Sequence, residues 1–231
     1  MARGASLSPP EQPTTRGIAV RLASSSAGRL LAAGAVTAAL LAGSGVAGSG
    51  VAAAAPARQP VAASSVAHAG AYARLHTLAD LAARRLATAD LVAAAKYGTD
   101  SPIDDPAREK QVLDDVARQA RELGADPEAT VRIFRDQIEA NKVVQRELHR
   151  RWDADPSQAP SERPDLAEVR KEINRVNGEL VRGIAASPSA RSMPSCRGFV
   201  VLAGVRVRGE RQLDVLHTVA LGRALRSVCA D

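Results

Sequence analysis

Apolar positions recur three and four residues apart along most of the chain after Tyr72, which is the spacing of one face of an α-helix. Alternation of apolar and polar residues, as in a half-buried β-strand, is almost absent. The apolar run "FVVLAGV" at 199–205 could be mistaken for a strand, but no other run in the sequence could pair with it. The pattern therefore predicts an all-α fold.

Capping residues and prolines indicate where the helices begin. Asp105 and Asp126 are each followed directly by proline, and an N-cap aspartate before a proline at the first helical position is a typical helix start. We expect helices over about 74–97, 105–123, 126–152 and 165–186, and one or two more, broken at Gly204 or Gly209, before Cys229. They predict a single-domain helical bundle of about five to six helices over residues 73–231.

The first quarter of the chain differs in composition from the rest. Four arginines precede an uncharged stretch over residues 30–57, which ends in small residues with an A-x-A pattern. This arrangement is typical of a secretory signal peptide with a long positively charged start. We predict a signal peptide over 1–57, cleaved near Ala57, followed by a flexible linker over 58–72.

A membrane anchor is the alternative for residues 30–57, because 28 uncharged residues can span a bilayer. The residues after Leu41 are almost all glycine, serine, alanine and valine, which are too weakly apolar to favour lipid. We therefore prefer cleavage, and expect a protein that is secreted or held in the periplasm or cell envelope. An anchored bundle would instead keep this segment in the mature protein.

Outside the predicted signal peptide, the net charge of the chain is small and says little about function. The full chain has a formal net charge of +6, but without residues 1–57 it carries 27 Lys and Arg against 24 Asp and Glu. Basic residues do not cluster, and the chain holds only two Phe, one Trp and two Tyr. A nucleic-acid surface, which needs basic patches or stacking aromatics, is therefore disfavoured.

Two cysteines, Cys196 and Cys229, lie in the last 36 residues. In an exported protein an isolated pair is typical of one disulfide, which would fix the C-terminal segment. Two buried free thiols are the alternative. A metal site is disfavoured because the four histidines show no ligand spacing with one another or with the cysteines.

Several polar residues fall on the apolar faces of the predicted helices. Arg85 and Lys96 are eleven residues apart, about three helical turns, so both project from the face that carries Leu78 and Val92. The neighbouring Arg84 is expected to face solvent. In later helices the polar residues within or beside apolar faces are Arg108, Glu109, Asn141, Gln145, Arg170 and Asn177.

Each of these residues alone has an ordinary explanation. A cation at the edge of an apolar face usually extends its head group into water, and a single buried amide such as Asn177 is usually hydrogen-bonded within the core. Together they are harder to explain, because several buried cations are costly and one glutamate cannot neutralise four of them. A bound ligand with two carboxylates, gripped by arginines, would balance the charges.

The same helix faces carry no histidine, serine or cysteine. A single glutamate without a second carboxylate is a poor acid/base pair, so acyl transfer and glycoside hydrolysis are disfavoured. Binding remains, or a reaction that needs only a shaped and charged cavity.

The ordered set of candidate residues resembles the secreted (gamma) subclass of the all-α chorismate mutases. The residues that carry the resemblance are Arg85, Lys96, Asp105, Arg108, Glu109, Asn141, Gln145 and Arg170, followed by Cys196 and Cys229. It covers about residues 74–231. It implies the Claisen rearrangement of chorismate to prephenate, with no cofactor and no metal, in a homodimer whose sites each lie within one chain.

The resemblance also implies roles for the residues that bind carboxylates. Arg85 and Arg170 would hold the two carboxylates of chorismate, and Arg108 would help to orient them. Asn141 would line the carboxylate end of the site.

The remaining roles concern the ether oxygen and the ring hydroxyl of the substrate. Lys96 and Gln145 would donate hydrogen bonds to the ether oxygen, where negative charge grows as the bond to the ring stretches. Glu109 and the backbone near Asp105 would bind the ring hydroxyl. The family carries Gln or Glu at position 145, and a glutamine donates at any pH.

Two other functions stay open from the sequence. The first is a secreted, non-catalytic helical module that binds a dicarboxylate or a partner protein, and the second is the membrane-associated bundle described above. The C-terminal helices show no second cationic cluster that would indicate an effector site.

Overall fold

The computed structural model describes residues 61–230, and the predictions for residues 1–57 lie outside them. The described part contains no strand, which confirms the all-α prediction. Its helices are α1 (Val61–Lys96), α2 (Pro106–Glu122), α3 (Pro127–Ala154), α4 (Leu166–Ala185), α5 (Pro188–Arg191), α6 (Cys196–Glu210) and α7 (Val215–Ala224), with a short 3-10 turn at Pro156–Gln158. Seven helices replace the expected five or six because α5 is a single turn after α4.

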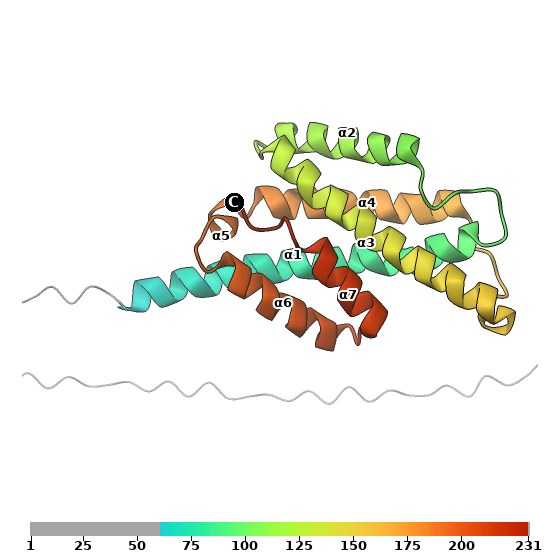
Figure 1. Cartoon of the computed structure of the whole chain (residues 1–231). Helices are drawn as coiled ribbons and strands as arrows, with labels where there is room; N and C mark the ends of the chain where they lie inside the picture. Colours follow the sequence, from blue (N-terminus) through green and yellow to red (C-terminus); the bar gives the residue numbers. More distant parts are fainter. Residues whose placement is uncertain (1–60, 231) are drawn as a thin grey trace, which may run out of the picture. The chain divides into compact units, whose positions relative to one another are not determined.

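Helix α1 runs through the middle of the bundle, with α4 above it and α6 and α7 below it in the view of Figure 1, and α3 crosses it diagonally and packs against α1, α2 and α7. Ala79, Ala82 and Ala89 on α1 are fully buried, and their small side chains let neighbouring helices approach closely. At Gly183 on α4, an added Cβ would lie 3.0 Å from a methyl group of Leu78. The alanine-rich sequence of α1 therefore allows it to pack on several faces at once.

Aspartate caps begin α2, α3 and α4, as the sequence predicts for the first two. The side chain of Asp105 accepts a hydrogen bond from the backbone N–H of Arg108 at 3.0 Å. Asp126 accepts from two backbone N–H groups of α3, and Asp165 accepts from one of α4. The caps set the register of the helices, and the first of them places α2 at the edge of the candidate site.

The first helix is longer than the sequence pattern suggests. It begins at Val61 rather than near Arg74, so residues 61–72, expected to belong to a linker, are helical. The physical reason is contact with the C-terminal part of the chain, because the Tyr72 ring lies 6.0 Å from that of Phe199 on α6. An alanine-rich segment has high helix propensity, and this packing stabilises it further.

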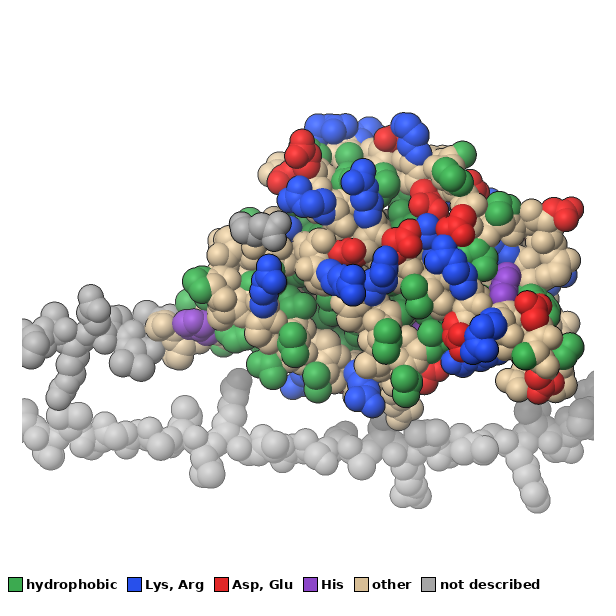
Figure 2. Space-filling model, in the orientation of Figure 1, with side chains coloured by type: hydrophobic (Ala, Val, Ile, Leu, Met, Phe, Trp, Pro, Cys, Tyr) green, Lys and Arg blue, Asp and Glu red, His purple; other side chains and the backbone are tan. Residues whose placement is uncertain are grey.

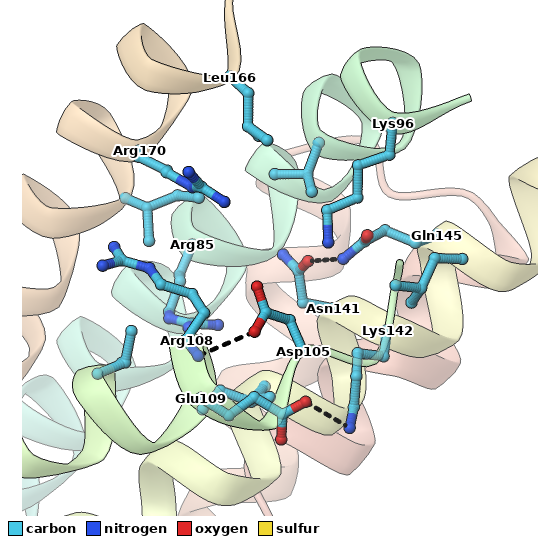
Figure 3. Close-up of a pocket in the computed structure, with 15 residues that line it drawn as sticks. Arg85, Lys96, Asp105, Arg108, Glu109, Asn141, Lys142, Gln145, Leu166 and Arg170 are labelled. Carbon is cyan, nitrogen blue, oxygen red and sulfur yellow. Dashed lines mark hydrogen bonds and ion pairs between the residues drawn. The ribbon is translucent and has the colours of Figure 1, made fainter. Parts of the chain in front are cut away.

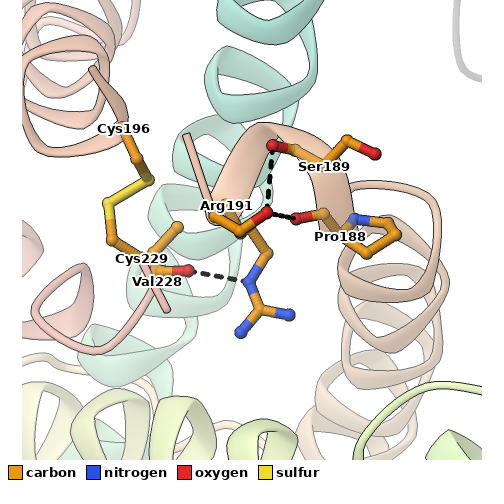
Figure 4. The surroundings of a disulfide bond; sticks show 7 residues. Pro188, Ser189, Arg191, Cys196, Val228 and Cys229 are labelled. Atoms are coloured by element: carbon orange, nitrogen blue, oxygen red, sulfur yellow. Dashed lines mark hydrogen bonds between the residues drawn. A yellow bond between two sulfur atoms is a disulfide. The ribbon is translucent and has the colours of Figure 1, made fainter. Parts of the chain in front are cut away.

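The C-terminal helices are joined by the predicted disulfide between Cys196 and Cys229, which is confirmed (Figure 4). Beside it, Arg191 Nε donates to the carbonyl oxygen of Val228 at 2.7 Å. In the chain-entropy account, a crosslink of this loop length stabilises the fold by about 3–4 kcal/mol. Helix α6 passes through Gly204 without a break and ends at Glu210, so of the two predicted break points the structure agrees with Gly209 and not with Gly204.

Hydrophobic side chains are exposed mainly on the face formed by α6 and α7, below the mixed charges over α2 and α3 (Figure 2). The most exposed large ones there are Val201, Leu202, Val205, Val215 and Val219. Among residues 61–230, no helix is both long and apolar enough to cross a membrane.

Arg84 does not face solvent as expected. It is half-buried, and its guanidinium pairs with Glu179 on α4 at 2.6 Å. The two residues lie 95 positions apart in sequence, so only the packing of α1 against α4 brings them together.

Candidate active site

A pocket lies between α1, α2, α3 and α4, beside the loop that precedes α2 (Figure 3). All eight candidate substrate-binding residues line it: Arg85, Lys96, Asp105, Arg108, Glu109, Asn141, Gln145 and Arg170. Apolar side chains complete the wall, including Val92, Ile138 and Ile173. Residues from four separate helices are thus brought to one cavity.

Arg85 on α1 is buried in the wall of the pocket and is only 5 % exposed. Its Nε donates to Asn177 Oδ1 at 2.8 Å, and a terminal nitrogen donates to the carbonyl oxygen of Gln137 at 2.9 Å. Its guanidinium carbon lies 5.8 Å from the centre of the Phe134 ring. Burial lowers the pKa of Arg85 to about 10. These contacts fix the fork without neutralising its charge.

Lys96 lies three turns along the same helix and is also buried. Its Nζ donates to the carbonyl oxygen of Pro102 at 2.7 Å, in the loop before α2. The pKa of Lys96 is lowered, first by burial and also by the nearby charge of Arg170, while the charge of Asp105 opposes the shift. The ammonium is therefore oriented by a neutral oxygen and remains available to an anionic or electron-rich ligand.

The other two cations of the pocket are less buried. Arg108 donates to Gln111 Oε1 at 2.6 Å and to Asn174 Oδ1 at 3.2 Å, which connects α2 to α4. Arg170 extends from α4 toward the pocket (Figure 3). Both are side chains that a bound carboxylate could attract by a small rotation.

Asn141 and Gln145 lie four residues apart on α3 and contact each other directly. Gln145 Nε2 donates to Asn141 Oδ1 at 2.6 Å, and both side chains are buried. The Oε1 of Gln145 is buried and has no hydrogen-bond partner. A half-turn of both amides would keep the contact with Asn141 as the donor and would free the NH₂ group of Gln145 for a ligand.

Glu109 is paired with Lys142, a residue that the sequence pattern does not single out. Lys142 Nζ lies 3.1 Å from Glu109 Oε1 and 3.1 Å from Asp104 Oδ1, and it also pairs with Glu139 on its own helix. Burial disfavours the ammonium form, but the hydrogen bonds to these carboxylates outweigh it and raise the pKa of Lys142. The acidic side of the pocket is therefore neutralised internally.

The cationic side of the pocket is not neutralised. Within residues 61–230, no carboxylate lies within ion-pair distance of the four cations Arg85, Lys96, Arg108 and Arg170. Buried cations without a counter-ion are costly, and two of these four are buried. The pocket is thus suited to a ligand that carries two negative charges.

Sequence reasoning missed the residues that support the site. Besides Lys142, Gln137 holds Arg85 through its backbone carbonyl, while its side chain donates to the carbonyl oxygen of Ala224 on α7 at 3.0 Å. Asn177 fits the expectation of a hydrogen-bonded core amide, but its partner is Arg85 itself. In the sequence, the only sign of this contact is that Asn177 lies on the apolar face of α4.

Comparison with known proteins agrees with this geometry. Residues 76–146 match the family described as chorismate mutase type II, a span that includes seven of the eight candidate substrate-binding residues, all but Arg170. The secreted chorismate mutase of Mycolicibacterium smegmatis is 39 % identical over 152 residues, which cover 66 % of this chain and 84 % of the relative. That of Mycobacterium tuberculosis is 35 % identical over 164 residues, 71 % of this chain and 82 % of the relative.

A solved structure shows the same arrangement of helices. The chorismate mutase from Burkholderia phymatum superposes with a TM-score of 0.66 at 34 % identity, covering 70 % of this chain and 99 % of its own. The family match, the sequence relatives and this fold agree with the resemblance found in the sequence. The chain belongs to the chorismate mutase family.

Proposed function

We propose that the pocket between α1 and α4 binds chorismate and rearranges it to prephenate. The protein is a chorismate mutase, an isomerase, and the unpaired charge of the pocket is the observation that supports placing the reaction here. Chorismate has two carboxylates, and the pocket has four cations with no carboxylate partner among the described residues. The reaction needs the substrate held in its compact reactive form and charge stabilised at one oxygen.

Arg85 and Arg170 are the proposed anchors for the two carboxylates. Arg85 already uses two of its donors on Asn177 and Gln137, and this fixes the plane of its fork before substrate arrives. Arg108, which lines the same pocket, would help to orient the bound dianion. Asn141 lines the same end of the cavity. Holding both carboxylates keeps the reacting carbons close together. This lowers the entropic part of the activation barrier.

Lys96 and Gln145 are the proposed donors to the ether oxygen. Their side chains approach each other in the pocket from α1 and α3 (Figure 3). In the transition state the bond from this oxygen to the ring lengthens and negative charge gathers on the oxygen. A fixed ammonium and an amide N–H stabilise that charge more than they stabilise the ground state.

The ring hydroxyl would bind at the acidic side of the pocket. Glu109 accepts one hydrogen bond from Lys142 through Oε1, which leaves its other oxygen to accept from the hydroxyl. The backbone at Asp105 lies beside it at the start of α2. These contacts orient the ring and take no part in bond breaking.

A direct assay tests the proposed function. Purified residues 58–231 are incubated with chorismate, the loss of chorismate is followed by its ultraviolet absorbance, and the formation of prephenate is measured in parallel. Turnover supports the proposal. Binding of chorismate without turnover would instead favour the non-catalytic dicarboxylate-binding module.

The pH dependence should report on Gln145. Since an amide donates in the same form at every pH, kcat/KM is expected to stay flat across neutrality. In Gln145→Glu the side chain must be protonated to donate, so its optimum is expected to shift to acid. Initial rates measured from acid through neutral to alkaline pH check this, since a glutamate carboxyl ordinarily has a pKa of about 4.3 and is ionised at neutrality. Full activity of Gln145→Glu at alkaline pH would show that position 145 is not a donor.

We also propose that the protein is a homodimer with each site built within one chain, because Arg85 and Arg170 line the same pocket of a single chain. Arg85→Ala and Arg170→Ala dimers are dissociated, mixed and reassociated. No activity is expected to return, because a mixed dimer then holds no complete site. Sites shared between chains would regain activity, and a monomeric mass in sedimentation would contradict the dimer.

Export is the last part of the proposal. Both relatives are named secreted chorismate mutases, and the Cys196–Cys229 disulfide suits an oxidising compartment. We therefore propose a secreted or periplasmic protein with a signal peptide over 1–57, cleaved near Ala57, and a catalytic domain that follows. The N-terminal mass of the mature protein tests the cleavage position and the anchored alternative.

A further inference from the structure

Lys142 gathers three carboxylates from three different segments at the edge of the pocket. Glu109 belongs to α2, Asp104 to the loop before it, and Glu139 to α3. Lys142 itself is 8 % exposed, and its side chain lies along the pocket wall (Figure 3). Its carboxylate partners are more exposed, at 57 % for Asp104, 29 % for Glu109 and 36 % for Glu139, so the ion pairs lie at the rim of the pocket, where water partly screens them.

This cluster is separate from the four unpaired cations. Asp104 has a second partner in Arg146 at 2.6 Å, outside the pocket. Glu109 has only Lys142 as an ion-pair partner among the described residues. Without that ammonium the nearest positive charges would be those of the pocket, and Lys96 already senses the charge of Glu109. A freed Glu109 would turn toward cations that the substrate needs.

We propose that Lys142 is a positioning residue for the reaction: it holds Glu109 against the pocket wall, with one carboxylate oxygen free for the ring hydroxyl, and keeps that carboxylate away from Lys96. The inference rests on the proposed role of Glu109. Lys142 acts through Glu109 and does not contact substrate. Its position one residue after Asn141 places its stem beside the catalytic face of α3 while its head group reaches α2.

A double-mutant cycle tests this coupling. Lys142→Gln, Glu109→Gln and the double variant are compared with the wild type by kcat and KM for chorismate. Lys142→Gln is expected to lower kcat/KM about 10- to 100-fold, because a carboxylate moved by even an ångström no longer orients the ring. In the Glu109→Gln background the same change is expected to have little further effect, since nothing is left for Lys142 to position.

Controls separate positioning from a purely structural role. Lys110→Gln removes an ammonium from α2 that is exposed and pairs with Asp114 at 2.6 Å, and it is expected to leave kcat/KM unchanged. Thermal unfolding of each variant, followed by circular dichroism, ensures that folded enzymes are compared. Should Lys142→Gln not fold, Lys142→Arg enters the cycle, because its wider fork also displaces Glu109.

Two results would overturn the inference. One is full activity of the position-142 variant, and the other is an effect of equal size with and without Glu109, which would mean that Lys142 acts on the fold alone. The proposed function fails separately. Full activity of Glu109→Gln would remove the role of Glu109, and an inactive wild type would remove the reaction itself.

Discussion

Lys96→Met is expected to lower kcat about 100- to 1000-fold, the usual loss when one fixed donor to a developing negative charge is removed. The ammonium is held by the Pro102 carbonyl oxygen and by the packing of α1, so it is in place before the ether bond stretches. Methionine keeps the length and the apolar stem but cannot donate. Because the charge on the ether oxygen exists mainly in the transition state, KM should change much less than kcat.

Steady-state rates of Lys96→Met beside Lys171→Met measure this effect. Lys171 lies on the outer side of α4 next to Arg170, is mostly exposed, and pairs with Glu168. Its removal takes away one positive charge near the site without touching the pocket, and kcat should be unchanged. A Lys96→Met enzyme with a normal kcat and a raised KM would make Lys96 a ground-state binding residue instead.

Arg85→Lys should be nearly as damaging, although it keeps the charge. The guanidinium donates to Asn177 and to the Gln137 carbonyl oxygen at once, and it still has donors for a carboxylate. An ammonium is a point donor that cannot bridge the same partners and present a flat fork. We expect kcat/KM to fall about 100-fold or more, since misplacement of a bound carboxylate disturbs the reactive form of the substrate.

The matched control is Arg84→Lys, at the neighbouring position. Arg84 pairs with Glu179 on the outer side of the contact between α1 and α4, and a partly exposed pair of this kind contributes little to stability. The prediction is checked by measuring initial rates at several chorismate concentrations for both variants and comparing their kcat/KM with that of the wild type. If Arg85→Lys kept wild-type kcat/KM, then the fork geometry would not matter and a single positive charge would be enough.

Helical spacing accounts for most of what the sequence predicts about the site. Residues three, four or eleven apart on a helix share a face, so Arg85 and Lys96, or Asn141 and Gln145, could be paired before any tertiary structure was known. Their meeting in one pocket follows from the packing of four apolar faces that each carry polar residues. The resemblance to a known family supplied the individual roles.

The supporting residues could not be predicted in the same way. Lys142 lies beside Asn141 but about 100° round the helix, where a lysine ordinarily faces water. It is buried because the loop and helix that carry Asp104 and Glu109 fold over it. Nothing local in the sequence reports a contact with residues more than thirty positions away.

The same limit explains the early start of α1. Small residues such as those at 61–72 suit a flexible linker and a helix equally well, so composition cannot choose between them. The choice is made by Phe199, whose ring packs on Tyr72 and lies far along the chain. Contacts between residues far apart in sequence therefore determine both where α1 begins and which residues support the pocket.

The uninterrupted course of α1 between Arg85 and Lys96 has a consequence for how this enzyme can change in length. The eleven intervening steps separate the two backbones by about 16 Å and return them to the same side of the helix within about 20°. One inserted or deleted residue would turn the two side chains apart by about 100°, and no adjustment of the neighbouring helices could restore both. A change of length in the segment between α3 and α4 does not alter the spacing of Arg85 and Lys96. Natural or engineered insertions and deletions should therefore be confined to such connections.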